Sequence, residues 1–109
     1  MVQNTDPGLT ITCVEDEQTI VFHAAGQINF TTSEALQLPL IAAAESSLKA
    51  LALDLGEVDF ISSAGLRVLM MAATRLRKRN ERLTLLRVQP MVLTVLKMAN
   101  FTRFLDIAA

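Results

Sequence analysis

The sequence predicts a single α/β domain, in which a mixed sheet of four to five strands carries helices mainly on one face. The chain has 109 residues, which suit one domain rather than two, so we assign residues 1–109 to it. Apolar residues make up 51% of the chain, which supplies a core and excludes a disordered protein. Strand-like and helix-like stretches alternate after an initial hairpin, which is the order of parallel strands joined by crossover helices.

The hairpin opens the predicted domain. Residues 1–8 are expected to form a flexible lead. Apolar and polar residues then alternate over residues 9–14 and again over residues 19–25, the period of two that is typical of strands. The acidic turn at residues 15–17 is short, so the two strands are expected to pair antiparallel. Gly26 is expected to end the second strand.

A helix and a buried strand are predicted next. Thr31 and Glu34 have the spacing of a capping box. An apolar stripe follows at helical spacing, and it comprises Leu36, Leu40, Ala43, Ala44 and Leu48. Pro39 lies inside this stretch, so we expect a kink or a late start of the helix. Residues 50–55 predict a buried strand, and residues 56–59 predict a loop.

The second half of the chain predicts two further helices with a strand between them. The helix over residues 64–79 has an apolar stripe of Leu66, Leu69, Met70, Ala73 and Leu76. Its last turn is basic, which offsets the negative end of the helix dipole, and Asn80 is expected to close it. Residues 83–88 predict a strand. Pro90 opens a last helix, whose stripe comprises Val92, Val95, Leu96 and Ala99, and residues 101–107 predict a short strand or loop.

The composition excludes several classes of function. Ten basic and eleven acidic residues leave a net charge of −1, and Trp and Tyr are absent, which disfavours binding of nucleic acid. One Cys and one His exclude Cys/His metal clusters and internal disulfides, and no motif indicates a cofactor. No apolar run reaches the roughly 18 residues that span a bilayer, and residues 1–8 lack an apolar signal core. We therefore expect a cytoplasmic protein without membrane insertion.

The residues that most often carry chemistry have structural explanations here. His23 lies in the middle of a strand, with no glycine-rich elbow near a serine, so we interpret it as an exposed or satisfied strand histidine. Cys13 falls on the core side of its strand, where small buried cysteines are common. The carboxylates of residues 15–17 are most simply a solvated turn, and Asp54 and Asp59 are capping or loop residues. The sequence therefore disfavours an enzyme.

The informative segment is residues 62–65, SSAG, at the junction between a strand and a helix. A serine at this point caps the free N–H groups of the helix. The same geometry favours a negative charge, because a helix N-terminus directs N–H groups and positive partial charge outward. A phosphate on one of these serines would be stabilised there, and it would add about −1.5 to −2 charge at one point of the surface.

Residues 53–66, LDLGEVDFISSAGL, closely resemble the signature of STAS domains, and in particular of the bacterial anti-sigma factor antagonists. That signature is an apolar strand that ends in Asp, a short loop, and then Asp-Ser-Ser/Thr-Gly-Leu at the start of a helix. Residues 26–29, GQIN, resemble the Gly-x-Leu-Asp before the first helix, and Pro90, Val92 and Leu96 resemble the last helix. The resemblance covers about residues 9–107 and implies the STAS fold.

The resemblance implies a partner-switching regulator that is not itself an enzyme. In that family the regulated residue is the serine two positions before the glycine, which is Ser63 in this chain. The unphosphorylated protein binds an anti-sigma factor, which is also a serine kinase with a histidine-kinase-like ATPase fold, and so frees the sigma factor. Phosphorylation releases the antagonist, and a metal-dependent serine phosphatase restores it. The expected partner surface comprises Asn29, Phe30, Ser62, Ser63, Ala64, Gly65 and Arg67.

Three positions depart from the family pattern, and they leave a second hypothesis open. Ser62 stands where the family has Asp, Ala64 where it has a second Ser or Thr, and Asn29 where it commonly has Asp. The alternative is a non-switching STAS protein that docks permanently, either as a scaffold of a stress-sensing assembly or as an accessory subunit of a lipid transporter. Ser63 at the switch position favours the antagonist.

Overall fold

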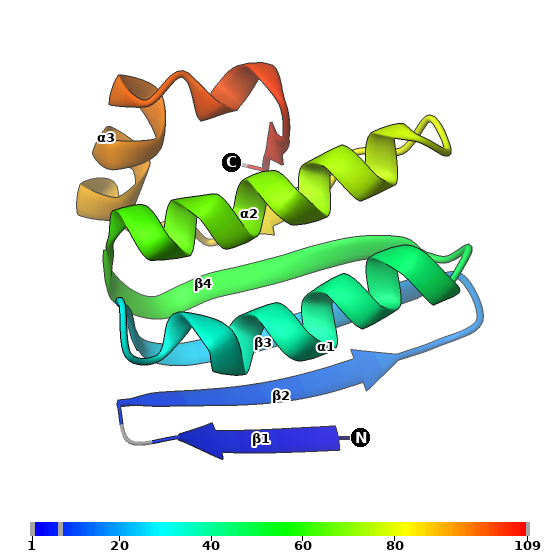
Figure 1. The fold of residues 1–109 in the computed structure, drawn as a ribbon, viewed down its shortest axis with the longest axis horizontal. Coiled ribbons are helices and arrows are strands. Elements are labelled where there is room, and N and C mark those ends of the chain that lie inside the picture. The colour runs from blue at the N-terminus through cyan, green and yellow to red at the C-terminus, as the bar shows by residue number, and fades with distance from the viewer. Residues whose placement is uncertain (1, 7, 109) are drawn as a thin grey trace.

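The structure is a computed structural model that describes residues 2–6 and 8–108, with side chains from residue 8 onward. Figure 1 shows two long helices side by side in front of a twisted sheet, with the shorter third helix at one end. The elements in chain order are β1 (Val2–Asp6), β2 (Leu9–Glu15), β3 (Thr19–Ile28), α1 (Ser33–Ser46), β4 (Ala50–Ile61), α2 (Ser63–Arg77), β5 (Thr84–Leu86), α3 (Pro90–Met98), the 3-10 turn η1 (Phe101–Arg103) and β6 (Asp106–Ile107).

The sheet is mixed, and its strands lie in the order of the sequence from β1 to β6. The first three strands pair antiparallel, which confirms the predicted hairpin of β2 and β3. From β3 onward the strands are parallel, and a helix connects each strand to the next. The predicted α/β class is therefore confirmed, with α1 and α2 on one face of the sheet.

Strand β1 corrects the expectation of a flexible lead. Residues 2–6 pair with β2, and the register runs from Val2 opposite Cys13 to Asp6 opposite Leu9. Gly8 follows with a φ of 94°, a left-handed conformation that glycine adopts readily. The sequence of β1 is mostly polar, so it lacks the apolar alternation that indicates a strand. β1 instead pairs with the edge of β2, whose N–H and C=O groups would otherwise lack partners. This strand takes the sheet to six, one more than expected.

The core lies between the sheet and the two long helices. On α2 the buried residues are Gly65, Val68, Leu69, Ala72, Ala73 and Leu76. The predicted stripe is thus correct for Leu69, Ala73 and Leu76, but Leu66 and Met70 are only half-buried. The small residue Ala72 is fully buried because α2 packs closely against α1. Asn80 closes the helix as predicted, with a φ of 60° and its N–H bonded to the carbonyl of Arg77.

The first helix differs from its prediction at both ends. Its N-cap is Thr32 rather than Thr31, and no side-chain capping bond forms, so the predicted capping box with Glu34 is wrong. The helix begins well before Pro39, which lies inside it, so the late start is wrong and the alternative, a kink at Pro39, stays a prediction. Leu36, Leu40 and Ala44 are buried as predicted, whereas Leu48 lies beyond the helix end and is 87% exposed.

Two strands run further than the sequence predicts. Strand β3 continues through Gly26 to Ile28, and β4 continues through the expected loop at residues 56–59 to Ile61. The register between them shifts on both sides of Ala25 and Gly26, so the ladder is irregular there. At Gly26 a side chain is excluded, because a Cβ would lie 2.1 Å from the carbonyl oxygen of Gly8. The glycine thus permits a close backbone approach instead of ending the strand.

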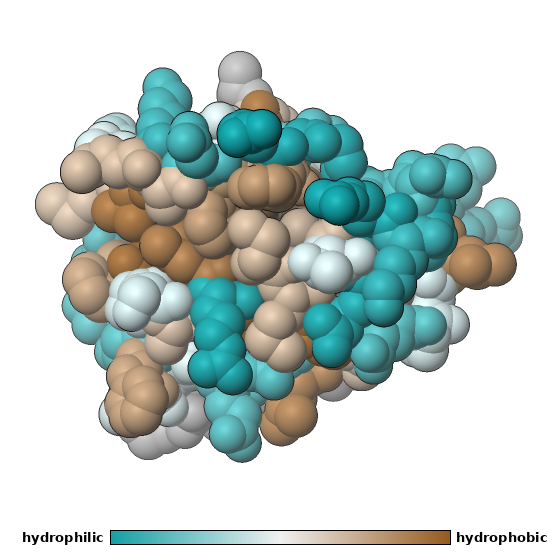
Figure 2. Space-filling model, turned by 45° about the horizontal axis from the view of Figure 1, so that its top comes forward, coloured by the Kyte–Doolittle hydropathy of each residue, from teal (hydrophilic) through white to brown (hydrophobic). Residues whose placement is uncertain are grey.

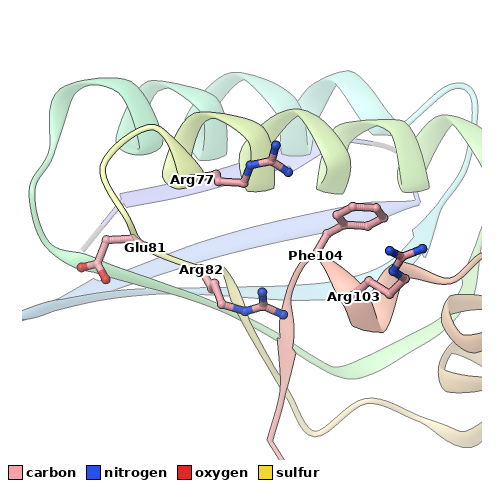
Figure 3. Close-up of a pocket in the computed structure, with 5 residues that line it drawn as sticks. All are labelled: Arg77, Glu81, Arg82, Arg103 and Phe104. Atoms are coloured by element: carbon pink, nitrogen blue, oxygen red, sulfur yellow. The ribbon is translucent and has the colours of Figure 1, made fainter.

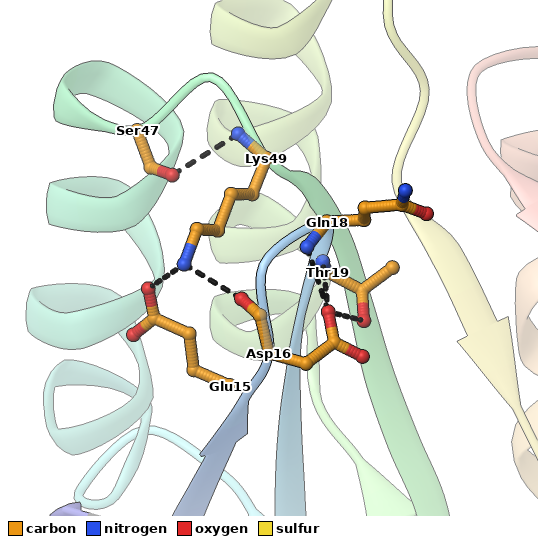
Figure 4. A network of polar contacts seen from close by, with 6 residues as sticks. All are labelled: Glu15, Asp16, Gln18, Thr19, Ser47 and Lys49. Carbon is orange, nitrogen blue, oxygen red and sulfur yellow. Dashed lines mark hydrogen bonds and ion pairs between the residues drawn. The ribbon is translucent and has the colours of Figure 1, made fainter.

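The acidic turn between β2 and β3 is solvated, as predicted. Figure 4 shows how its polar groups are satisfied: the carboxylate of Asp16 accepts from the backbone N–H groups of Gln18 and Thr19, both at 2.7 Å. These two bonds are the main reason that the pKa of Asp16 lies below its ordinary value. Lys49 bonds the carboxylate of Glu15 and the carbonyl of Asp16, and so ties the turn to the start of β4.

Candidate functional site

The junction between β4 and α2 is built around a serine cap. Ser62 has extended backbone angles, φ −95° and ψ 176°, and its hydroxyl accepts from the N–H of Gly65 at 3.4 Å. Its carbonyl accepts the first helical hydrogen bond, from the N–H of Leu66 at 2.9 Å. The predicted cap at this junction is therefore confirmed, and Ser62 forms it.

Ser63 is the first residue of α2, and its side chain is exposed. The first turn of the helix contains no acidic residue, so no side-chain carboxylate there offsets the positive end of the helix dipole. The hydroxyl of Ser63 is not used for capping, because Ser62 has that task. Ser62 therefore caps the helix, whereas Ser63 is accessible to a second protein.

Gly65 sits where no side chain fits. A Cβ on this residue would lie 2.6 Å from a methyl group of Ile28 and 2.7 Å from Cγ1 of Ile61. Both neighbours are buried branched side chains in the core, so neither can move aside easily. Gly65 therefore lets the first turn of α2 lie directly on the ends of β3 and β4. Since it is buried, its role in the predicted partner surface is to position its neighbours.

The loop before α1 lies beside this junction. The N–H of Ser62 donates to the carbonyl of Ile28 at 2.8 Å, so the ends of β3 and β4 are neighbours. Asn29 follows directly, and its side-chain oxygen accepts from the N–H groups of Thr31 and Thr32 at 3.0 and 3.1 Å. Asn29 thus shapes the turn that enters α1. Phe30, at the tip of this turn, is 85% exposed.

Arg67 completes the predicted set. It lies four residues after Ser63, so the two side chains share one face of α2. Both are exposed. The structure therefore brings onto one end of the molecule six of the seven residues proposed from the sequence, with Gly65 buried beneath them: Asn29, Phe30, Ser62, Ser63, Ala64 and Arg67. Phe60 at the end of β4 is also exposed, and the set of residues proposed from the sequence does not include it.

The comparison with known proteins decides the family. The sequence profile of the STAS domain matches residues 10–109, nearly the whole chain.

The chain belongs to the STAS domain family.

Among STAS proteins it belongs with the anti-sigma factor antagonists, which are regulators rather than enzymes. It is 32% identical, over 101 residues, to the Bordetella bronchiseptica protein BtrV, which carries the name of an anti-sigma factor antagonist. The match covers 93% of this chain and 78% of BtrV.

Solved structures share the fold at lower sequence identity. An anti-sigma factor antagonist from Mycobacterium paratuberculosis matches with a TM-score of 0.82 and 21% identity, over 94% of this chain and 87% of that one. The anti-sigma factor antagonist SpoIIAA matches in its unphosphorylated form with a TM-score of 0.77 and 16% identity, over 91% and 88% of the two chains. The phosphorylated form of SpoIIAA from Bacillus matches with a TM-score of 0.71 and 15% identity, over 91% of each chain. These likenesses confirm the STAS fold.

This STAS domain also contains a polar cluster that the sequence analysis missed. Asp54 is only 6% exposed, and its carboxylate accepts from Nε of Arg87 at 2.9 and 3.1 Å. Nδ1 of His23, on the neighbouring strand, lies 3.3 Å from the same carboxylate. The interpretation of Asp54 as a capping or loop residue is therefore wrong, since it lies inside β4 and holds a cation from the β5–α3 connection. His23 is a satisfied strand histidine, as interpreted.

The surroundings of Asp54 act on its pKa in opposite directions. Burial by itself raises the pKa of Asp54, but the hydrogen bonds from Arg87 and from the N–H of Gly56, with the charges of Arg87 and His23, outweigh it. The net pKa lies below the ordinary value of 3.8. The cluster holds no nucleophile, so its arrangement serves to hold two segments together.

The single cysteine of the STAS domain is part of the packing. Cys13 is half-buried against the core, on the side that the sequence predicted. Burial, with a smaller effect from the charge of Glu15, raises the pKa of the thiol. The reactive thiolate is therefore disfavoured at neutral pH.

Among the residues that the structure describes, no helix is long and apolar enough to cross a membrane.

Proposed function

We propose that this STAS domain is a cytoplasmic partner-switching antagonist whose state is set by phosphorylation of Ser63. The unphosphorylated domain binds an anti-sigma factor that is also a serine kinase, and binding frees the sigma factor. The kinase transfers the γ-phosphoryl group of ATP to the hydroxyl oxygen of Ser63, whose proton is lost. The phosphorylated domain dissociates, and a metal-dependent serine phosphatase hydrolyses the phosphate ester and restores it.

One observation carries the proposal: Ser63 is exposed at the first position of α2, while its neighbour Ser62 supplies the cap. A kinase can therefore modify Ser63 without removing a hydrogen bond that holds the helix. The free domain also tolerates the phosphate, because the N-terminus of a helix favours an anion. Phosphorylation therefore changes the surface and leaves the fold as it is.

Release of the partner follows from the cost of burying this charge. A group with about −1.5 to −2 charge that is buried without matching cations costs several kcal/mol, which lowers affinity by orders of magnitude. The relatives support this scheme: BtrV carries the name of an antagonist, and SpoIIAA has been solved both with and without a phosphate.

The first experiment identifies the partner. Ser63→Ala and Ser63→Asp variants are immobilised side by side and exposed to extract from the native cells, and bound proteins are identified by mass. Ser63→Ala is expected to retain a kinase of the stated class, and Ser63→Asp is expected to retain at least about tenfold less of it. Equal capture by the two variants would contradict a charge-controlled interface.

The second experiment locates the phosphate. The wild-type chain and the Ser62→Ala variant are incubated with ATP and the captured kinase, and intact mass and peptide mapping follow. A single phosphate on Ser63 in both proteins is expected. Phosphate on Ser62, or none on either serine, would overturn the switch and favour the alternative of a non-switching scaffold or accessory subunit.

A further inference from the structure

A second surface feature lies at the other end of α2. A recess of about 310 Å³ opens between the last turn of α2, the α2–β5 loop and the segment around η1, and Figure 3 shows its lining of Arg77, Glu81, Arg82, Arg103 and Phe104. A smaller hollow of about 50 Å³ adjoins it along α2, lined by Met70, Ala73, Thr74, Arg77 and Phe104. Arg77 and Phe104 line both, so the two form one groove, which we name the α2–η1 groove.

The rim of the α2–η1 groove is cationic. Three arginines and one glutamate give its larger recess a formal charge of +2, whereas the whole chain has −1. In the view of Figure 3 the carboxylate of Glu81 points away from the three guanidinium groups. Arg82 is held by Asp106 at 2.8 Å. Within the described part of the chain, Arg77 and Arg103 form no ion pair, so both remain available to an external anion.

The floor of the groove is apolar. Ala73 is buried, Met70 and Phe104 are half-buried, and the guanidinium carbon of Arg103 lies 5.9 Å from the centre of the Phe104 ring. Figure 2 shows the same character on a larger scale: hydrophobic side chains gather between α3 and α2, and hydrophilic side chains border them toward the C-terminal end of α2. An occupant must therefore offer apolar and anionic groups together.

We propose that the α2–η1 groove is a docking site for an acidic segment of a partner protein. One apolar side chain of that segment packs on Ala73 and Phe104, and flanking carboxylates pair with Arg77 and Arg103. Guanidinium groups suit this task because they bind carboxylates through two parallel hydrogen bonds. A protein segment fits better than a membrane, because the site is concave, and better than a free phosphate, which gains nothing from the apolar floor.

This site is independent of the Ser63 surface. Fourteen positions of α2 separate Ser63 from Arg77, a distance of about 21 Å at 1.5 Å per residue. That distance exceeds the screening length of about 8 Å at physiological salt. Phosphorylation of Ser63 is therefore expected to leave the groove unaffected, and a partner can remain attached through it while the switch surface is released.

The test uses a fluorescein-labelled peptide in which single Leu or Phe residues are separated by pairs of acidic residues, Asp and Glu. The peptide is titrated with the full chain, and binding is followed by fluorescence anisotropy. The double variant Arg77→Ala/Arg103→Ala is expected to bind it about tenfold more weakly. The double variant Lys78→Ala/Lys97→Ala removes two exposed cations outside the groove and is the matched control, expected to bind like the wild type. Ser63→Asp is also expected to bind like the wild type, so the result stands whether or not Ser63 is a switch.

Three outcomes would overturn the docking site. An equal loss in the Lys78→Ala/Lys97→Ala control would mean that general charge attraction explains the binding. Equal affinity for a peptide of glutamate alone would show that the apolar floor has no role. Binding to vesicles of phosphatidylcholine and phosphatidylserine that depends on Arg77 and Arg103, without binding of the peptide, would assign the surface to a membrane instead. Thermal unfolding followed by circular dichroism confirms that each variant is folded.

Discussion

Arg87 binds Asp54 across 33 positions of the sequence, with Nε 2.9 Å from Oδ2. Arg87 adopts a left-handed backbone conformation, φ 52°, in the connection between β5 and α3. Gly56 makes room for it, since a Cβ there would lie 2.6 Å from the guanidinium carbon. Gln89, at the N-cap of α3, donates to the carbonyl of Gly56 at 2.8 Å. These contacts hold the start of the last helix against β4.

Because Asp54 and Arg87 form an ion pair, we predict that the free energy of unfolding depends on pH. The pKa of Asp54 is lowered in the folded state, so its contribution is present above the unfolded pKa and is lost as pH falls through the folded value. Asp54→Asn should lower the free energy of unfolding at pH 7 by about 1–3 kcal/mol, because Arg87 loses a charged partner. The variant should also lose less further stability than the wild type below about pH 4. Urea unfolding over a pH series measures both quantities.

Asp59→Asn is the matched control for this prediction, because Asp59 is an exposed aspartate of the same strand. Its unfolding free energy should stay within about 0.5 kcal/mol of the wild type. Identical pH profiles for the wild type and Asp54→Asn would show that the pair does not stabilise the fold.

Gly65→Ala should destabilise the domain through crowding. The added methyl group would meet Ile28 and Ile61 at distances well below normal contact. Overpacking of this kind costs about 1–3 kcal/mol, so the midpoint of chemical unfolding should fall. Ser63→Ala, two residues earlier and exposed, should remain within about 0.5 kcal/mol of the wild type. A Gly65→Ala variant as stable as the wild type would mean that α2 can shift away from the sheet.

Two leucines that the sequence placed in the core should differ sharply. Leu69 is fully buried on α2, so Leu69→Ala should cost about 2–5 kcal/mol. Leu48 is 87% exposed, so Leu48→Ala should change stability by less than about 0.5 kcal/mol. Equilibrium denaturation of the two variants measures both changes in the free energy of unfolding. A loss below about 1 kcal/mol for Leu69→Ala would remove this residue from the core.

Arg67→Glu should weaken the binding of the switch partner without unfolding the domain. The side chain is exposed one helical turn from Ser63, so a reversed charge there acts on the partner and leaves the core intact. Calorimetric titration with the captured kinase measures the affinity. Lys97→Glu, an exposed charge reversal on α3, is the control and should bind normally. Unchanged affinity for Arg67→Glu would exclude Arg67 from the interface.

Local patterns in the sequence were enough for the fold class, the hairpin of β2 and β3, and the junction at Ser62 and Ser63. Period-two alternation and helical spacing report which side of an element is buried, and a serine before an apolar helix reports its start. The resemblance to the family signature then predicted Ser63 as the switch residue, because that signature lies in consecutive residues. These features depend on residues within a few positions of one another in the chain, so they can be predicted from the sequence without a structure.

Tertiary structure decided what depends on distant segments. The strand at residues 2–6 exists as a partner of β2, and its own residues carry no alternation that indicates it. Leu48 is exposed because the helix ends before it, and the buried Asp54 is paired because Arg87 reaches it from the β5–α3 connection. The groove between Arg77 and Arg103 likewise joins residues 26 positions apart. Sequence periodicity fixes the faces of each element, whereas pairing and close approach depend on how those elements are packed together.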